Sequence, residues 1–309
     1  MNRTLLCVPL AVSTTEEAVA ILQSPDRPFD IAEVRLDYLS DPNPEQILGA
    51  KPCPLIFTHR AARDGGNWSG GEDERLDLLR KAELAGADFI DIEADAVSRH
   101  HWHGRARRIV SYHNFSETPA NLPEMVRQME EGPCEIVKVA TLARSHADVL
   151  AVLGLLKAAN KPTIALAMGP LGGITRILGP KFGAFLVFAS LATGQESAPG
   201  QIPAKDMVQH YRFGSISPET RVYFWVDAFG HGRRVAAALN SAMKRANHYG
   251  VVVDLPEGDP SELARVYTDL PLAGVASALN ADPAACYTSW TGSKPDPLLL
   301  DFCSSLGKR

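Results

Sequence analysis

The sequence contains little cysteine, and its cysteines form no pattern that would bind a metal or cross-link a fold. Five cysteines are scattered over 309 residues, and no C-x-x-C pair occurs. Disulfide frameworks and zinc sites both need more clustered spacing. We therefore expect neither a disulfide-stabilised domain nor a metal site.

An excess of positive charge is also missing. Lysine and arginine total 31 against 36 aspartate and glutamate residues, which leaves a net charge of −5. Nucleic acids and anionic membranes are bound mainly through clustered positive charge. Neither is therefore expected to be the main partner of this chain.

The N-terminus lacks a long hydrophobic run. Its apolar stretch, Leu5–Leu10, is too short for a signal peptide or a membrane-spanning helix. We interpret this stretch as a first buried strand. The absence of a targeting segment predicts a soluble, cytoplasmic protein.

A nucleotide-binding fingerprint is absent as well. No G-x-G-x-x-G occurs, and Gly169-Pro170-Leu171-Gly172-Gly173 does not have the spacing of a phosphate-binding loop. We interpret this glycine-rich stretch as a turn that leads to Arg176. No nucleotide cofactor is expected.

Short apolar runs alternate with amphipathic stretches through about residue 210, as in α/β proteins. The expected strands are Leu5–Pro9, Ile31–Leu36, Leu55–Thr58, Phe89–Ile92, Arg108–Tyr112, Ile136–Val139, Thr163–Ala167 and Phe185–Phe188. The expected helices are Thr15–Gln23, Asp73–Ala85, Ala120–Met129, Ala147–Ala158 and Ile174–Lys181. Eight such strands predict a (β/α)8 TIM barrel, with a doubly wound sheet as the alternative.

Polar residues interrupt these runs near the carboxyl ends of the strands, which in a barrel converge on one mouth. They are Glu33, Arg35, Asp37, Arg60, Asp64, Asp91, Glu93, His113, Lys138 and Arg176. Alternation within Glu33–Asp37 places its three charged residues on one strand face. This pattern is compatible with a structural layer of ion pairs, but convergence from several strands favours an active site.

Lys138 lies among the apolar residues Ile136, Val137, Val139 and Ala140, which indicate a fully buried strand. Burial disfavours the ammonium form of lysine, and a neutral amine is a nucleophile that forms a Schiff base with a ketone. The alternative is a lysine at a strand end that extends its ammonium group to water. Lys138 is therefore a candidate Schiff-base residue.

Residues 1 to about 210 resemble type I 3-dehydroquinate dehydratase, the Schiff-base enzyme of the shikimate pathway and of aromatic amino acid biosynthesis. The matching stretches are Glu33–Asp37, Thr58-His59-Arg60, Gly65-Gly66, Ser111–Phe115, Val137–Val139, Met168-Gly169, Thr175-Arg176, Phe182-Gly183 and Ser197–Ile202. The stretch Trp68–Arg75 resembles the versions fused to shikimate dehydrogenase in plants. The resemblance implies a cofactor-free hydro-lyase that converts 3-dehydroquinate, a small-molecule substrate, to 3-dehydroshikimate.

The resemblance also implies a role for each matching residue. Lys138 forms the imine with the C3 ketone, and His113 removes the C2 proton and later protonates the departing C1 hydroxyl. The substrate-binding residues that it implies are Glu33, Arg35 and Arg60 for the hydroxyls, Arg176 for the carboxylate, and Ser197 and Gln201 on a closing loop. A histidine with a pKa near neutrality suits consecutive base and acid steps.

One position departs from the family pattern. Asp64 stands where the family usually has a glutamate that orients the catalytic histidine and supports its charged form. Aspartate keeps the charge but reaches roughly 1.5 Å less. We expect retained activity with altered efficiency.

Residues 211–309 are expected to form a small α/β domain that follows the barrel domain of residues 1–210. They faintly resemble the substrate-binding half of shikimate dehydrogenase, with a strand at Arg221–Val226, a helix at Val235–Asn247 and a strand at Val251–Leu255. The serines that hold shikimate in that family are missing, Gly232 and Arg234 stand in the corresponding region, and no catalytic lysine is recognisable. We expect a non-catalytic remnant that packs on the barrel or mediates association, for example in a homodimer.

Two rival functions remain open. A class I aldolase is also a barrel with a Schiff-base lysine, although His113 and the Ser197–Gln201 segment argue against it. A non-enzymatic sensor or scaffold would keep the pocket without turnover, which the Asp64 substitution and the degenerate C-terminal region both make conceivable. Turnover of 3-dehydroquinate tests the dehydratase, a carbon–carbon cleavage assay tests the aldolase, and ligand binding without turnover would indicate the sensor.

Overall fold

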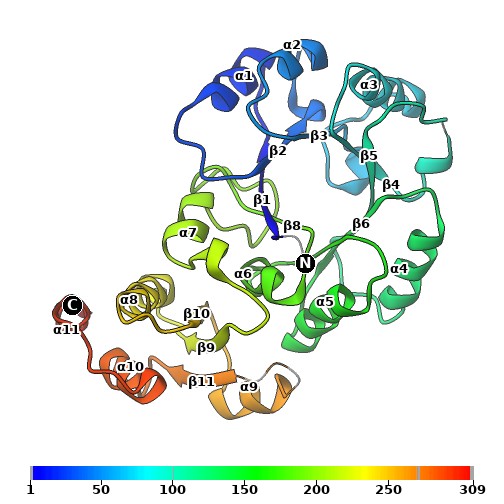
Figure 1. Ribbon diagram of the computed structural model, residues 1–309. Coiled ribbons are helices and arrows are strands. Elements are labelled where there is room, and N and C mark those ends of the chain that lie inside the picture. The colour runs from blue at the N-terminus through cyan, green and yellow to red at the C-terminus, as the bar shows by residue number, and fades with distance from the viewer. Residues whose placement is uncertain (1–2, 100, 269, 271, 307–309) are drawn as a thin grey trace.

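A ring of eight parallel strands forms the larger part of the protein, and a three-stranded sheet lies beside it (Figure 1). The computed structural model describes residues 3–99, 101–268, 270 and 272–306. The ring is the predicted (β/α)8 barrel, which is thereby confirmed over a doubly wound sheet.

The barrel strands follow one another around the ring in sequence order. They are β1 (Leu5–Leu10), β2 (Ile31–Arg35), β3 (Leu55–Thr58), β4 (Phe89–Glu93), β5 (Arg107–Asn114), β6 (Ile136–Leu142), β7 (Thr163–Met168) and β8 (Leu186–Phe188). Between β7 and β8 the described backbone forms no ladder, and a hydrogen bond of 2.9 Å from Phe185 N to Thr163 O joins the two ends. The barrel is therefore nearly closed.

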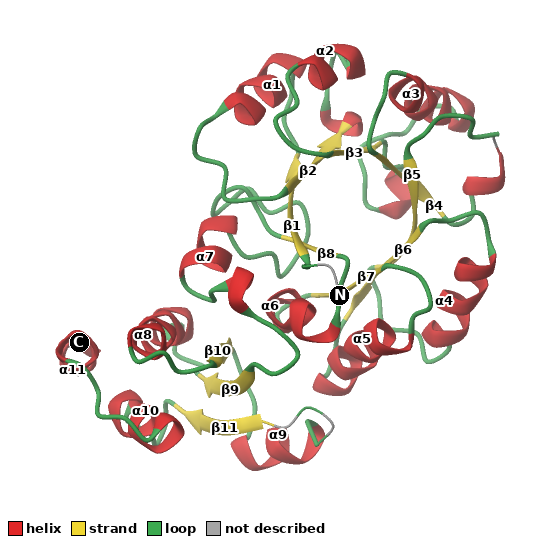
Figure 2. Ribbon diagram, in the orientation of Figure 1, coloured by secondary structure: helices red, strands yellow, loops and turns green. Residues whose placement is uncertain are grey.

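The helices surround the strands on the outside (Figure 2). They are α1 (Thr15–Gln23), α2 (Pro44–Gly49), α3 (Glu72–Leu84), α4 (Leu122–Glu131), α5 (His146–Ala158), α6 (Gly172–Phe182) and α7 (Ala204–Gln209). Every residue of β2, β3 and β4 is buried, including the charged residues that interrupt the apolar sequences of β2 and β4. None of the helices in the described part of the chain is long and apolar enough to cross a bilayer.

Two short helices of the barrel, α2 and α7, were not predicted. In α2 the sequence Asn43-Pro44 resembles a turn, but Asn43 caps the helix by accepting a hydrogen bond from Gln46 N, and Pro44 occupies the first turn. Helix α7 follows Pro203. Each helix has six residues, which is too few for a recognisable helical period.

The second sheet has the strand order β10-β9-β11, and all its strands are parallel. Its elements are β9 (Arg221–Val226), α8 (Gly232–Arg245), β10 (Gly250–Leu255), α9 (Pro260–Val266), β11 (Leu272–Ser277), α10 (Pro283–Thr291) and α11 (Pro297–Leu306). Helix α8 buries an apolar stripe that includes Val235, Leu239 and Met243, and its last turn carries Lys244 and Arg245, which suit the helix C-terminus.

Side-chain contacts join the small sheet to the outer helices of the barrel. His146 at the start of α5 contacts the hydroxyl of Tyr267 at 2.8 Å, and Lys181 of α6 donates to the carbonyl of Thr220 at 2.9 Å. Tyr211, which is 1% exposed, donates a hydrogen bond to Asp254. The small sheet thus packs against the barrel.

Asn240 of α8 completes the hydrogen bonding of β10, which is an edge strand. Its side chain accepts from Val252 N at 2.7 Å and donates to Val252 O at 2.9 Å, and Asn240 is fully buried. One buried amide therefore satisfies two backbone groups that the ladder leaves free.

Replacing Asn240 by alanine should destabilise the small sheet. Two buried backbone groups would lose their partners, so the free energy of unfolding should fall by about 2–4 kcal/mol. Urea unfolding followed by the fluorescence of the four tryptophans measures the change. Ser241→Ala, at the next position of α8, is the control, and a loss in Asn240→Ala no larger than in this control would contradict the role.

Candidate active site

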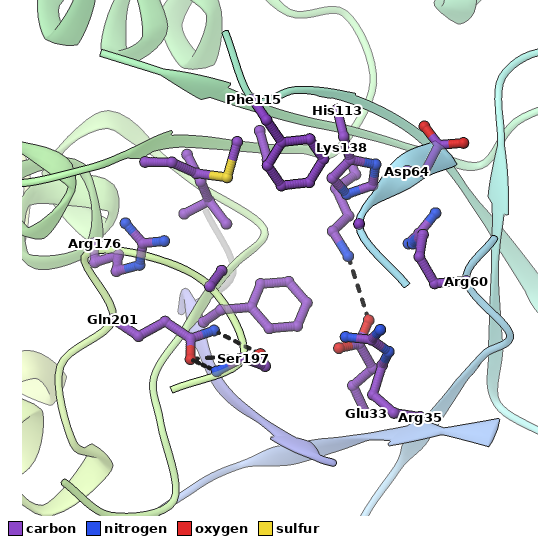
Figure 3. Close-up of a pocket in the computed structure, with 16 residues that line it drawn as sticks. Glu33, Arg35, Arg60, Asp64, His113, Phe115, Lys138, Arg176, Ser197 and Gln201 are labelled. Carbon is purple, nitrogen blue, oxygen red and sulfur yellow. Dashed lines mark hydrogen bonds and ion pairs between the residues drawn. The ribbon is translucent and has the colours of Figure 1, made fainter. Parts of the chain in front are cut away.

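The carboxyl ends of the barrel strands enclose a cavity that contains all nine residues predicted for the site (Figure 3). Strand β2 contributes Glu33 and Arg35, and the segment after β3 contributes Arg60 and Asp64. His113 comes from β5, Lys138 from β6 and Arg176 from α6. The loop before α7 supplies Ser197 and Gln201. The remaining lining includes Phe115, Leu166, Met168 and Phe188. The alternation along β2 therefore does place its charged residues inside the barrel.

Lys138 is buried among carboxylates. Its Nζ donates to Asp91 Oδ2 at 2.7 Å and contacts Glu33 Oε1 at 3.3 Å, and only 7% of its side chain is exposed. Burial favours the neutral form of Asp91, but the charges of Arg60 and Lys138 outweigh it and lower the pKa of Asp91. The lysine is thus charge-compensated inside the barrel and does not extend to water.

An ion-pair layer supports this lysine from the neighbouring strands. Arg60 donates to Asp91 at 2.6 Å, to Glu93 at 2.9 Å and to Ser111 at 2.8 Å. Arg75 of α3 pairs with Glu93 at 2.7 Å. The structural layer and the candidate active site, which the sequence presented as alternatives, therefore coexist and share Asp91.

His113 lies beside Lys138 and is kept uncharged. Burial, together with the charges of Arg60 and Lys138, lowers the pKa of His113 well below its usual range. Its Nδ1 atom is buried and has no hydrogen-bond partner among the described residues, while Phe115 stacks on the ring at a centroid distance of 6.2 Å. The sequence predicted a pKa near neutrality for His113, whereas its pKa in the structure is lower. The imidazole is therefore neutral, which is the form that accepts a proton.

Asp64 lines the cavity without a hydrogen bond to His113. Its carboxylate pairs with Arg63 at 3.3 Å, and the described residues include no hydrogen bond between Asp64 and His113. Burial and the nearby charge of Glu93 raise the pKa of Asp64. The orienting contact that the family resemblance implies is not formed in this structure.

Arg176 is a buried cation without a carboxylate partner in the part of the chain that the structure describes. Its guanidinium donates to the carbonyls of Ala167 at 2.6 Å and Gly172 at 2.8 Å, and Arg176 is 1% exposed. A side chain at Gly172 would lie 2.7 Å from this guanidinium, so glycine is required there. Desolvation lowers the pKa of Arg176 to about 10, and an anion in the cavity would compensate this charge.

The charged groups of β2 that line the cavity differ in how they are held. Arg35 forms a two-pronged pair with Asp37 at 2.9 and 2.7 Å, which fixes its guanidinium at the cavity wall. Glu33 accepts from Thr58 at 2.8 Å as well as facing Lys138. Both side chains are thus positioned by neighbours before any ligand binds.

The loop between β8 and α7 covers the cavity from the side of Arg176. Within it the Gln201 side chain accepts from Ser197 N at 2.9 Å and donates to Ser197 Oγ at 3.1 Å. At its base, Ser190 N donates to Ile202 O at 3.0 Å. The loop is therefore anchored at its base and held by a contact between its two predicted binding residues (Figure 3).

The sequence placed Asp91 among the polar residues at the barrel mouth, but it assigned no role in the site to Asp91 or to Phe115. The alternation of Asp91 with Glu93 on a buried strand indicates that both face the barrel interior. The sequence does not reveal that Asp91 is the nearest partner of Lys138. Phe115 belongs to a recognised stretch, and its 47% exposure is explained by its position at the cavity mouth.

Comparison with known proteins agrees with this geometry. The family model of type I 3-dehydroquinase matches residues 6–218. A 3-dehydroquinate dehydratase of Methanothermobacter thermautotrophicus is 39% identical over 225 residues, which cover 70% of this chain and 99% of that protein. A crystal structure of the type I 3-dehydroquinate dehydratase of Clostridium difficile with covalently modified comenic acid has a TM-score of 0.60 at 26% identity, covering 70% of this chain and 94% of the other.

The similarity extends beyond the barrel. The bifunctional 3-dehydroquinate dehydratase/shikimate dehydrogenase of Arabidopsis thaliana chloroplasts is 34% identical over 297 residues, which cover 92% of this chain. The chain spans about half of that protein, 49% of its length. The likeness to plant fusions and to part of shikimate dehydrogenase is thereby confirmed, and this chain belongs to the type I 3-dehydroquinase family of hydro-lyases.

Proposed function

We propose that the barrel dehydrates 3-dehydroquinate to 3-dehydroshikimate through an imine on Lys138. The observation that carries this proposal is one cavity in which a charge-compensated lysine lies beside a neutral histidine. The covalently modified ligand in the Clostridium difficile structure supports covalent chemistry in a relative.

In the first step the ammonium of Lys138 gives up a proton, the free amine adds to the C3 ketone, and the carbinolamine takes up that proton and loses water to give a protonated imine. One positive charge is present before the step, on the ammonium, and one after it, on the iminium. Glu33 and Asp91, which contact Nζ of Lys138, therefore stabilise both states. These carboxylates compensate the buried positive charge before the substrate binds.

In the second step the iminium withdraws electrons and makes the C2 proton acidic. The neutral imidazole of His113 takes this proton, and the C2–H electron pair becomes the double bond of an enamine. The imidazolium then protonates the departing C1 hydroxyl, so that water leaves and the electron pair forms the C1–C2 double bond. Hydrolysis of the conjugated imine releases the product and restores Lys138.

Substrate orientation follows from the cations around these two residues. The substrate carboxylate would supply the negative charge that Arg176 lacks among the described residues. In the view of Figure 3, Arg176 lies on the side of the cavity opposite Arg60, so the substrate would be held at two ends with its ketone toward Lys138. Movement of the loop that carries Ser197 and Gln201 would exclude water.

Lys138→Ala should abolish dehydration of 3-dehydroquinate, because no other cavity residue can form the imine. Borohydride added during turnover should attach the ligand irreversibly to Lys138 of the unmodified protein, and mass spectrometry of peptides locates the adduct. Lys205→Ala, at an exposed lysine paired with Asp26, should retain both activity and adduct. An adduct on Lys161 or Lys181 would disprove the assignment, and binding without turnover would support the sensor function.

Asp64→Ala should lower kcat by roughly ten- to a thousand-fold with little change in KM. Asp64 makes no hydrogen bond to the neutral His113 but lines the same cavity, and its carboxylate would support the imidazolium that forms during proton transfer, a step whose catalysis contributes about that much. Borohydride trapping should persist, because the imine does not depend on Asp64. Asp64→Glu is the matched variant and should remain within about tenfold of the unmodified protein, since the carboxylate is kept and its reach increases. Full activity of Asp64→Ala would show that another group orients His113.

The acid limb of the kcat/KM profile should lie below pH 6.5. Catalysis requires the neutral imidazole, and the lowered pKa of His113 keeps the imidazole neutral through the range where an ordinary histidine is half-protonated. Initial rates between pH 4.5 and 9 test this. Half-maximal kcat/KM at or above pH 6.5 would contradict the depressed pKa in the free protein.

A further inference from the structure

One arginine beside the barrel cavity is surrounded by three carboxylates. Arg63 lies in the short 3-10 helix Ala62–Asp64 after β3, and its side chain is 46% exposed. Its guanidinium donates to Glu72 at 3.2 and 3.3 Å and to Asp95 at 3.4 Å, and its Nε lies 3.3 Å from Asp64 Oδ2. Among these four residues, all of which the structure describes, Asp64 alone lines the cavity. Arg63 therefore joins a residue of the site to carboxylates outside it.

Asp64 is the partner that Arg63 holds least firmly. Glu72 and Asp95 accept hydrogen bonds from the guanidinium, whereas the contact with Asp64 is an ion pair at Nε. Glu72 also pairs with Arg75 at 2.7 Å, and the hydrogen bond from Arg75 is the main cause that lowers the pKa of Glu72 to about 2. Glu72 is therefore ionised at neutral pH. If Asp64 turned away, Arg63 would still be paired with two carboxylates.

The backbone around Asp64 is closely constrained, so its side chain is the part that can turn. Asp64 N donates to Ala61 O at 3.0 Å, and Gly65 has a φ of 75°, a conformation that favours glycine. A side chain at Gly66 would overlap the carbonyl group of Arg60, so the chain also passes too closely there for any other residue. Rotation of the Asp64 side chain is therefore the movement available to its carboxylate.

The turn that carries Asp64 borders the ring of His113 through Phe115. A side chain at Gly65 would overlap the Phe115 ring, and this ring stacks on His113 at a centroid distance of 6.2 Å. Asp64 and His113 line the same cavity (Figure 3), and His113 Nδ1 is buried without a hydrogen-bond partner among the described residues. An imidazolium carries a proton on both ring nitrogens, so the charged form of His113 would have a donor for a carboxylate.

The surrounding charges set the direction in which Asp64 turns. The charged groups that act on His113 are Arg35, Arg60, Asp91 and Lys138. Those that act on Asp64 are Arg60, Arg63, Glu93 and Asp95. In the free protein the neutral imidazole offers no charge to Asp64, which stays with Arg63. Once His113 has taken a proton, its positive charge attracts Asp64, while the like charges of Glu93 and Asp95 favour its departure from Arg63.

We propose that Arg63 is a positioning residue, which holds Asp64 away from the neutral His113 and releases it to the imidazolium that forms during proton transfer. Arg63 does not line the cavity and acts through Asp64. The catalytic consequence rests on the proposed function, in which His113 is the base. The resting arrangement of Arg63, Asp64 and His113 can be tested without turnover.

Histidine NMR of the full-length protein provides this test. The ring-labelled protein is titrated between about pH 4.5 and 9, and the His113 signal is assigned by its loss in His113→Gln. Arg63→Gln should raise the pKa of His113 by about 0.3–0.7 pH unit, the size of an ion pair near the surface, because the freed Asp64 turns to the ring and favours its charged form. Arg63→Lys keeps the positive charge and should stay within about 0.2 pH unit of the unmodified protein. Arg80→Gln, at an exposed arginine of α3 paired with Asp77, is the control and should leave this pKa unchanged.

Arg63→Gln in the Asp64→Ala protein separates this route from a direct effect of the arginine charge. The pKa of His113 should then not change, because the carboxylate that Arg63 holds is missing. The proposal is overturned if the shift is equal in both backgrounds, if Arg63→Gln alone leaves the pKa of His113 where it was, or if the ring stays neutral to the lowest pH in both proteins.

Turnover of 3-dehydroquinate adds the catalytic readout. The acid limb of the kcat/KM profile should move to higher pH in Arg63→Gln by the same amount as the NMR titration. An acid limb that stays in place while the NMR titration shifts would contradict His113 as the base, and hence the proposed function, while it would support the hold of Arg63 on Asp64.

Discussion

The pairing of Lys138 with Asp91 is the constraint on which the rest of the site depends. At 2.7 Å inside the barrel, the pair permits a cation in a position where an isolated one would be very costly. Asp91 also pairs with Arg60, and Arg60 pairs with Glu93. Compensation of the buried charges therefore extends across β4, β6 and the segment after β3. The same positive charges keep His113 neutral. Lys138 and His113 thus share one network of charges.

The architecture follows from much simpler features of the sequence. Short, largely apolar runs identified every barrel strand, because parallel strands covered by helices are buried on both faces. Boundaries shifted by a few residues: β6 runs on to Leu142 because polar Thr141, which the apolar pattern excludes, is fully buried. Helices α2 and α7 escaped prediction because six residues carry no period, and Asn43-Pro44 serves equally as a turn or a cap.

The composition of the site could be predicted further than its interactions. Family motifs identified nine residues that share one cavity, yet their catalytic roles rest on the proposal above. The partners of these residues became known only from distances in the structure. Asp91 rather than Glu33 is nearest to Lys138, and Asp64 pairs with Arg63 rather than with His113. The pKa of His113 depends on charges from β3 and β6, which no local sequence pattern encodes.

The incomplete ladder between β7 and β8 separates the barrel into a stiff part and a compliant part. Lys138, His113 and their carboxylates come from strands that pair with neighbours on both sides, whereas the loop with Ser197 and Gln201 continues from the three-residue strand β8, which pairs with β1 alone. Local opening requires the fewest broken hydrogen bonds at this seam. The loop can therefore move to let ligands enter and leave while the ion pairs around Lys138 remain intact.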